Sequence, residues 1–317
     1  MSGESNLTHL QATLIALLVT VLWSSSWILI RWGLDDEALQ PITFAALRYG
    51  LASLVLIAAV VSRASVRSHV GGLDRATWVR IVGLGAVFYA LTQGAQFVAI
   101  DNQPAATSSL VLSWTPLVVA GLSAWTLAEV PHRRQFAGAV LVVVGAWSYF
   151  AGDLGATVVG MVAALVGLGA NAASSLVGRS LGRQGHVPPL VITALSMTIG
   201  SVILVVIGLA TEGLPTVSTR AWLIIAALAV VNTAVAFTLW NMSLRHLSAV
   251  ESAGINNTML IQIALLAWIF LDEQPGVFGF VGIVLVSMGI FLTQAAGLRL
   301  RTASSSLGQK RASRERT

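Results

Sequence analysis

The sequence predicts an all-α protein that crosses a membrane many times, and three observations support this fold class. Hydrophobic residues make up 56% of the 317 residues and charged residues only 10%, whereas about 25% of the residues in a soluble domain are charged. The hydrophobic residues form ten separate runs, each near the roughly 20 residues that a helix needs to cross a bilayer core. A pattern of Glu, Pro and Gly residues recurs in the two halves of the chain. We therefore expect ten transmembrane helices in two repeats.

The ten apolar runs define both the expected spans and the divisions of the chain. The spans are expected near residues 11–31, 41–62, 77–100, 104–127, 132–151, 155–178, 188–210, 221–243, 247–271 and 275–295. The first run lacks a basic leading segment and a small-x-small cleavage site, so we expect a retained span and not a signal peptide. The predicted divisions are a cytoplasmic N-terminus (1–10), a first repeat (11–151), a second repeat (155–295) and a disordered basic cytoplasmic tail (298–317).

The internal duplication is clearest around the fourth and fifth spans. At an offset of 144 residues, four punctuating residues of the first half align with residues of the same type in the second half: Glu129, Pro131, Gly138 and Gly145 with Glu273, Pro275, Gly282 and Gly289. Earlier spans align at an offset of 148, which pairs Pro41 with Pro189. Glycines seven residues apart are typical of closely packed membrane helices, so we expect these glycines to serve packing.

The distribution of basic residues predicts the orientation. Of the 18 Lys and Arg residues, fifteen fall on the side of the N-terminus, two (Arg31 and Arg220) fall on the other side, and Arg48 lies within a span. Cytoplasmic loops carry the excess of Lys and Arg, so both termini are expected to be cytoplasmic. Because each repeat has five spans, an odd number, the second repeat must enter the membrane from the opposite face. The repeats are therefore predicted to be inverted.

The sequence resembles the EamA-type transporters of the drug/metabolite transporter superfamily over nearly its whole length. The resemblance rests on an apolar helix with a central proline (Pro116), a Glu that ends the helix (Glu129) and a glycine-punctuated helix that follows, twice in one chain. It implies ten spans in two five-helix repeats and movement of a small metabolite or drug, often outward. The second copy departs from the pattern because Leu260 stands where the repeat would have the central proline.

Composition excludes several classes of function. The chain has no cysteine, and its five histidines fall in predicted loops or the tail, so we expect no metal site, no cofactor and no catalytic centre. A P-loop and a dinucleotide-binding fingerprint are also lacking. The net charge of +5 lies in loops between apolar spans, which argues against nucleic acid as a partner. The expected partners are a small-molecule substrate and the lipid bilayer, and the sequence is compatible with a monomer.

Arg48 is the clearest charge inside a predicted span. Burying a charge in a bilayer costs at least about 2.5 kcal/mol, so such a residue needs a reason to be there. Arg48 follows the start of the second span by about two turns, and its repeat equivalent is the neutral Ser196. One interpretation is a bidentate partner for a substrate carboxylate. The other is a structural clasp on helix-end carbonyls or on Asp101.

Glu251 is the only carboxylate well placed to enter a span, one turn after the ninth span begins. If it is buried, it is a candidate proton site for antiport. The alternative is a first-turn carboxylate that is stabilised by the helix dipole at a wet cytoplasmic mouth.

Neutral polar residues predict a central cavity. They occur at helical spacing on the first, third and fourth spans and on the equivalent sixth, eighth and ninth, whereas the fifth and tenth spans carry almost none. A cavity between the repeats would explain that distribution, although interhelical hydrogen bonds can also explain single residues. The residues expected to line the cavity, with Arg48, are Trp23, Trp27, Tyr89, Gln93, Gln96, Ser113, Trp114, Asn171, Ser175, Thr233, Phe237, Trp240, Asn256 and Asn257.

These features favour a secondary transporter for a small neutral or zwitterionic solute. We expect an amino acid, an aromatic one included, that stacks on tryptophans and is exported by alternating access. The resemblance contributes the amino-acid part of this expectation. One alternative is an exporter of cationic drugs coupled to protons through Glu251, and another is a receptor or scaffold that does not transport. The expected location is a bacterial cytoplasmic (inner) membrane.

Overall fold

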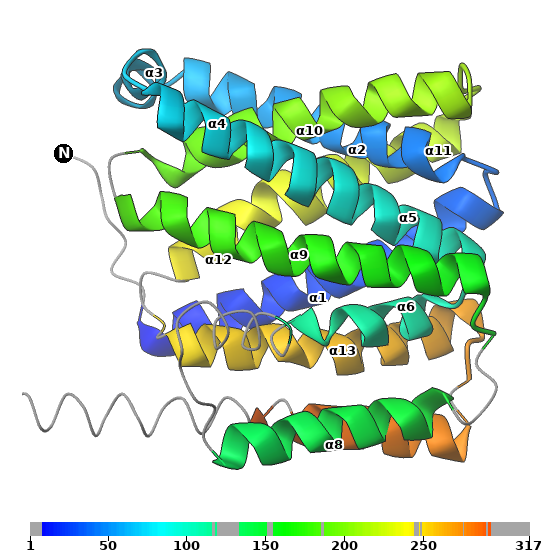
Figure 1. Cartoon of the computed structure of the whole chain (residues 1–317). Coiled ribbons are helices and arrows are strands. Elements are labelled where there is room, and N and C mark those ends of the chain that lie inside the picture. The colour runs from blue at the N-terminus through cyan, green and yellow to red at the C-terminus, as the bar shows by residue number, and fades with distance from the viewer. Residues whose placement is uncertain are drawn as a thin grey trace, which may run out of the picture.

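The computed structural model describes residues 8–115, 118, 133–150, 155–184, 187–243, 247, 249–274, 276–289 and 291–292. Within these residues the protein is all-α and has no strand, and the helices lie side by side in layers (Figure 1). The described part thus agrees with the predicted fold class. Pro116, Glu129, Pro131, Pro275 and the C-terminal tail lie outside the described residues.

The first half of the chain begins with a long helix that has a capping box. The Thr8 hydroxyl accepts a bond from the Gln11 amide, and the Gln11 side chain accepts one from the Thr8 amide. The third span is continuous over Arg75–Asn102 but changes from α to π and back. The elements are α1 (His9–Asp35), α2 (Pro41–Val61), α3 (Ala64–Gly71), α4 (Arg75–Leu84), η1 (Gly85–Thr92), α5 (Gln93–Asn102), α6 (Ala105–Leu112) and α8 (Arg133–Phe150).

The second half repeats this order without the short helix α3. Its third span again consists of an α segment, a π segment and an α segment. The elements are α9 (Val158–Gln184), α10 (Pro189–Thr211), α11 (Thr219–Ala226), η2 (Ala227–Val235), α12 (Ala236–Ser243), α13 (Ala249–Leu271) and the helix Val277–Gly289.

Several of these helices have the length and composition of membrane spans. In the described part of the chain four are long and apolar enough to cross a bilayer, namely α1, α2, Arg75–Asn102 and α10. Shorter apolar helices cover Val158–Ser174, Thr219–Val235, Ile261–Leu271 and Val277–Gly289. The chain is therefore a multi-pass membrane protein, while the total of ten spans and the cytoplasmic position of both termini remain predictions.

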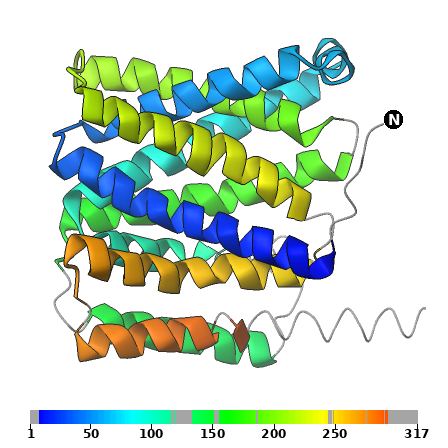
Figure 2. The ribbon, with the colours of Figure 1, turned by 180° about the vertical axis from the view of Figure 1, so that it is seen from behind.

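The glycines of the repeated frame lie where α8 crosses the helix Val277–Gly289, drawn in green and orange at the bottom of both ribbon views (Figures 1 and 2). A Cβ atom on Gly145 would lie 2.8 Å from the carbonyl oxygen of Gly282, and one on Gly289 would lie 2.6 Å from that of Gly138. Early residues of one helix thus meet late residues of the other, so the two helices are antiparallel. The prediction that these glycines serve close packing is confirmed.

A second antiparallel pair, α2 and α10, lies at the opposite side of the molecule (Figure 1). A Cβ on Gly208, near the end of α10, would lie 2.9 Å from the Thr43 hydroxyl at the start of α2. The carboxylate of Glu212 then accepts bonds from the amides of Ile42 (3.0 Å) and Thr43 (2.7 Å). These amides have no partner inside their own helix, so a residue of the second half caps a helix of the first.

Glu273, which the repeat frame singles out, makes the same kind of cap at α6. Its two carboxylate oxygens accept bonds from the amides of Ala105 (3.1 Å) and Ala106 (3.2 Å). A carboxylate at a helix N-terminus also interacts favourably with the helix dipole. The function of this Glu is therefore to join the end of α13 to the start of a first-half helix.

The two π segments were not predicted from the sequence, yet they occupy equivalent places in the two halves. In each, a threonine hydroxyl donates to the carbonyl five residues earlier: Thr92 to Val87 (2.9 Å) and Thr233 to Leu228 (2.8 Å). Each segment also packs on the second span of the other half, η1 on α10 and η2 on α2. π turns are rare and frequent at functional sites, which directs attention to the contact between η2 and α2.

The glycine crossing leads to a stability prediction. Gly145→Ala adds a Cβ within 2.8 Å of the Gly282 carbonyl and 2.7 Å of the Val286 amide, so α8 and its partner must separate, at a cost of about 1–3 kcal/mol. Gly169→Ala is the matched control, because a Cβ there meets nothing within 4 Å and alanine is about 1 kcal/mol better than glycine in a helix. Thermal unfolding in detergent should show a lower Tm for the first variant only. Equal Tm values would contradict the crossing.

Candidate functional site

Arg48 is the centre of the polar residues in the described part of the bundle. It lies on α2, and only 5% of its surface is exposed. Its guanidinium carbon lies 5.0 Å from the centroid of the Tyr49 ring and 6.0 Å from that of Phe97, both within cation–π range. One terminal nitrogen, Nη2, donates to the Thr233 hydroxyl on η2 at 3.4 Å. The Nε atom has no hydrogen-bond partner among the described residues, so this buried cation keeps a free donor.

The clasp considered for Arg48 from the sequence is made by a different arginine. Arg31, near the end of α1, donates to the carbonyls of Ile100, Asp101 and Gln103 at the end of the third span. It also forms an ion pair with Asp35 at 2.7 Å. These contacts give Arg31 a structural role, whereas the free Nε donor of Arg48 is available to another partner.

A tyrosine that follows Arg48 connects it to the third span. The Tyr49 hydroxyl donates to Oε1 of Gln93 on α5 at 2.6 Å. The Tyr49 ring also meets the edge of Tyr89, with ring centroids 5.9 Å apart. Gln93 and Gln96 are both half-buried. Tyr49 thus contacts three expected cavity residues, Arg48, Tyr89 and Gln93. Tyr49 itself is not among the expected cavity residues.

Three other expected residues form an aromatic cluster between α1 and α12. The Trp23 ring centroid lies 5.3 Å from that of Phe237 and 5.2 Å from that of Trp240, and both ring pairs are tilted. All three side chains are half-buried. Trp27, one turn after Trp23, is instead buried in the main hydrophobic core.

The fourth and sixth spans meet through a polar contact. Nδ2 of Asn171 on α9 donates to the hydroxyl of Thr115 at 3.1 Å. Ser113 donates within its own helix to the Leu110 carbonyl. Trp114 lies between two apolar clusters, and its indole Nε1 has no partner among the described residues.

Two polar residues that the sequence analysis overlooked join helices. The amide nitrogen of Asn232 on η2 donates to the Leu22 carbonyl and to the hydroxyls of Ser25 and Ser26 (3.0 Å each) on α1. Gln262 on α13 bonds to Ser24 and Thr20 on α1. These residues behave as interhelical connectors. The search for polar residues at helical spacing on one face of a span did not identify them.

Four expected residues are not brought into these contacts. The side chains of Ser175, Glu251 and Asn257 lie outside the described part of the structure, and Asn256 is exposed on α13. No group of three or more His, Asp or Glu residues that could hold a metal ion is found among the described residues.

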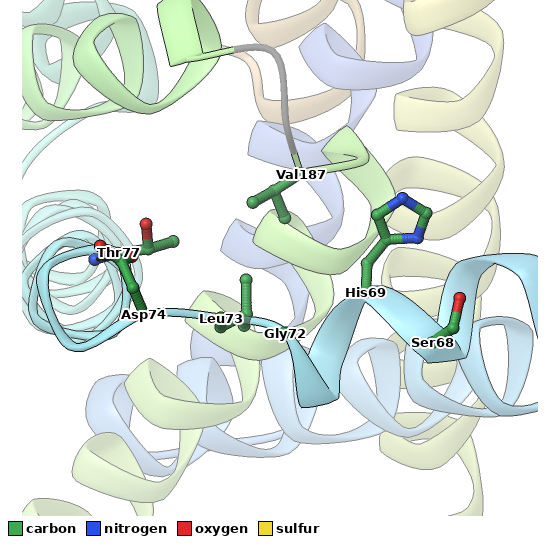
Figure 3. Close-up of a pocket in the computed structure, with 7 residues that line it drawn as sticks. All are labelled: Ser68, His69, Gly72, Leu73, Asp74, Thr77 and Val187. Carbon is green, nitrogen blue, oxygen red and sulfur yellow. Dashed lines mark hydrogen bonds between the residues drawn. The ribbon is translucent and has the colours of Figure 1, made fainter.

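Two hollows in the described part of the structure are not lined by Arg48. One, of 640 Å³, is formed where α3, the start of α4 and Val187 meet (Figure 3). Asp74 caps α4 there, and hydrogen bonds from Thr77 lower the pKa of that carboxyl. The other, of 450 Å³, is an apolar groove on α2, α10, α9 and the third span. Neither contains a residue of the expected cavity wall.

Comparison with known proteins gives the family. The EamA-like transporter family matches residues 10–151 and again residues 158–294. The chain belongs to the EamA-like transporter family. Each half of this EamA-like transporter therefore contains one match to the family, which is consistent with two repeats.

Named relatives and a solved structure agree with this membership. The chain is 26% identical over 305 residues to a "Probable amino-acid metabolite efflux pump" of Escherichia coli (strain K12), covering 91% of this chain and 96% of the relative. It is 24% identical over 294 residues to an "Uncharacterized transporter" of Archaeoglobus fulgidus, covering 89% and 96%. A crystal structure at 21% identity has a TM-score of 0.65 and covers 92% of this chain and 99% of its own, which shows the same fold.

Membership establishes the general activity of this EamA-like transporter. It is an integral, multi-pass membrane protein that moves a small molecule, and it is not an enzyme. Lipid and a small-molecule substrate are its partners by that activity. The substrate and the residues that bind it do not follow from membership.

The contacts divide the polar residues of the transporter into connectors and free side chains, and this division can be tested. Asn232→Ala removes bonds from η2 to α1 and should cost about 0.6–1.7 kcal/mol, the range of interhelical hydrogen bonds in membranes. Gln96→Ala changes a half-buried side chain on α5 and should leave the Tm within about 1 °C while it slows exchange of substrate. A lower Tm for Gln96→Ala and an unchanged Tm for Asn232→Ala would reverse the assignment.

Proposed function

We propose that this transporter exports an amino acid or a closely related zwitterionic metabolite across a bacterial inner membrane by alternating access. The substrate lies in a central cavity between two inverted five-span repeats, with both termini in the cytoplasm. The proposal is supported by the location of Arg48 and the aromatic cluster, and by the similarity to the "Probable amino-acid metabolite efflux pump" of Escherichia coli. Aromatic amino acids are included among the candidate substrates.

The observation that carries the proposal is the spacing of two contacts along the eighth span. Thr233 contacts Arg48, and Phe237, four residues later, contacts Trp23. Four helical residues rise by about 6 Å, roughly the reach from the carboxylate of an amino acid to the end of its side chain. A cationic end and an aromatic end are therefore separated by about one helical turn.

The chemistry of the two ends matches the two ends of an amino acid. Arg48 retains a free Nε donor in a buried setting, where a charge-assisted hydrogen bond to a carboxylate is strong. Trp23, Phe237 and Trp240 offer ring faces and edges to an apolar or aromatic side chain. Such ring faces also attract an ammonium group. A zwitterion with an apolar part satisfies both ends at once.

The helix contacts support alternation between two states. α8 and Val277–Gly289, and likewise α2 and α10, are antiparallel pairs with one member from each half, as inverted repeats require. At the outer ends, Glu212 and Glu273 cap helices of the first half. Breaking and remaking such inter-repeat contacts on alternate sides would open the cavity to each compartment in turn.

Counterflow in proteoliposomes tests the proposal. We expect vesicles that contain the wild-type protein and an unlabelled amino acid to take up the labelled one from a panel of the twenty common amino acids. Arg48→Gln should reduce uptake by about 10–100-fold, since a hydrogen bond to a charged group is worth about 1.5–3 kcal/mol. Arg220→Gln is the matched control, because this arginine is 61% exposed and pairs with Asp36 and Glu37. It should retain uptake within about twofold.

Other outcomes identify the rival functions. Uptake of none of the amino acids would contradict the proposal. Export of cationic drugs that is lost in Glu251→Gln and retained in Arg48→Gln would instead support the proton-coupled drug exporter.

A further inference from the structure

We propose that Tyr49 is a positioning residue that directs the NH₂ donors of Gln93 at the carboxylate of the substrate, and so selects acids over amides. This inference rests on the proposed function, because it concerns the same site. It concerns a residue that is not among the expected cavity residues, and it gives that residue one task. The task is to hold the side-chain amide of Gln93 in one orientation while the Tyr49 ring packs against Arg48.

The contacts of Tyr49 support this task. Tyr49 is only 4% exposed, so its hydroxyl has little access to water. The hydroxyl donates to Oε1 of Gln93 at 2.6 Å. On its face the same ring carries the guanidinium of Arg48, with the guanidinium carbon 5.0 Å from the ring centroid. One side chain therefore contacts both of the polar groups that would meet a carboxylate.

The direction of the Tyr49 bond determines what Gln93 can offer. A glutamine side chain has one acceptor oxygen and one NH₂ group with two donors. With the oxygen taken by the tyrosine hydroxyl, the NH₂ group is the part left for a substrate. Arg48 contributes its free Nε–H and, like every arginine, has no acceptor. The two residues next to Tyr49 thus offer mainly donors, because the one acceptor between them, Oε1 of Gln93, is directed at the tyrosine hydroxyl.

A site of donors distinguishes a carboxylate from a carboxamide. An ionised carboxylate accepts hydrogen bonds at both oxygens and donates none. The NH₂ group of a carboxamide cannot accept a hydrogen bond from these donors. A buried donor of the site would then have no partner, and the loss in binding free energy is large. We therefore expect the wild-type protein to prefer L-phenylalanine to L-phenylalaninamide.

The chain supplies a matched control for the tyrosine hydroxyl. Ser53 lies one turn after Tyr49 on α2, is only 3% exposed, and donates its hydroxyl to the Gly50 carbonyl of the same helix at 2.8 Å. Tyr49→Phe and Ser53→Ala each remove one buried hydroxyl from the same helix. A general effect of losing a buried hydroxyl would appear in both variants.

The experiment is counterflow of labelled L-phenylalanine and labelled L-phenylalaninamide in proteoliposomes with the full chain. In Tyr49→Phe, Gln93 is free to turn its oxygen toward the substrate. We expect the KM for L-phenylalanine to rise about 5–10-fold with the maximal rate within about twofold, and the preference for acid over amide to fall by at least fivefold. Ser53→Ala should keep both the KM and the preference within about twofold of the wild type.

A second variant keeps the test decisive if Tyr49→Phe does not fold. Gln93→Glu preserves an oxygen for the Tyr49 hydroxyl and replaces the NH₂ donors by a second oxygen. It should lose uptake of L-phenylalanine by at least tenfold and shift the preference toward the amide. An unchanged preference in Gln93→Glu, or equal effects of Tyr49→Phe and Ser53→Ala, would overturn the role of Tyr49.

Failure of the proposed function would give a different result. In that case the wild-type protein would not exchange L-phenylalanine, or exchange would be insensitive to Arg48→Gln. If exchange occurs and depends on Arg48, but the preference for acid over amide is the same in the Tyr49 and Gln93 variants as in the wild type, only the present inference is wrong.

Discussion

The architecture depends on the close antiparallel contact of equivalent helices from the two halves. At the crossing of α8 and Val277–Gly289, Gly145 and Gly289 are so near the opposite backbone that no larger residue fits without movement. In a bilayer, lipid is as apolar as the helices, so association must come from such close packing and from hydrogen bonds. Each glycine is related to the other by the internal repeat, so one duplicated feature provides both sides of the crossing.

On this symmetric scaffold the candidate site is asymmetric. η1 and η2 occupy equivalent places, and each packs on the second span of the other half. At η1 the contact is made by backbone and small residues, since a Cβ on Gly85 would lie 2.6 Å from the Ser196 carbonyl. At η2 the contact is a buried arginine on a threonine hydroxyl. In the proposed function, symmetry serves the movement between two states, while Arg48, which has no charged equivalent in the other repeat, recognises the substrate.

Much of the fold could be predicted from the sequence, because hydropathy, the repeated glycines and the buried arginine are local patterns with direct physical meaning. The partners of those residues could not. Periodicity identified Thr233, Phe237 and Trp240 on one face, but the contacts of Arg48 and Trp23 with that face are tertiary. The π segments carry no composition signal, and they change the helical phase near Asn232. Tyr49 is not among the expected cavity residues because a tyrosine in a span does not reveal where its hydroxyl points.

The inversion of the two halves is the central claim, and labelling of single cysteines tests it most directly because the natural chain has none. Ser68, in the short helix α3, and Thr216 are exposed residues in the segments that follow the second span of each half. In right-side-out vesicles a membrane-impermeant maleimide should label Thr216→Cys, and it should label Ser68→Cys only after the membrane is permeabilised. Labelling of both residues from the same side would contradict the inverted architecture and the two-sided cavity that depends on it.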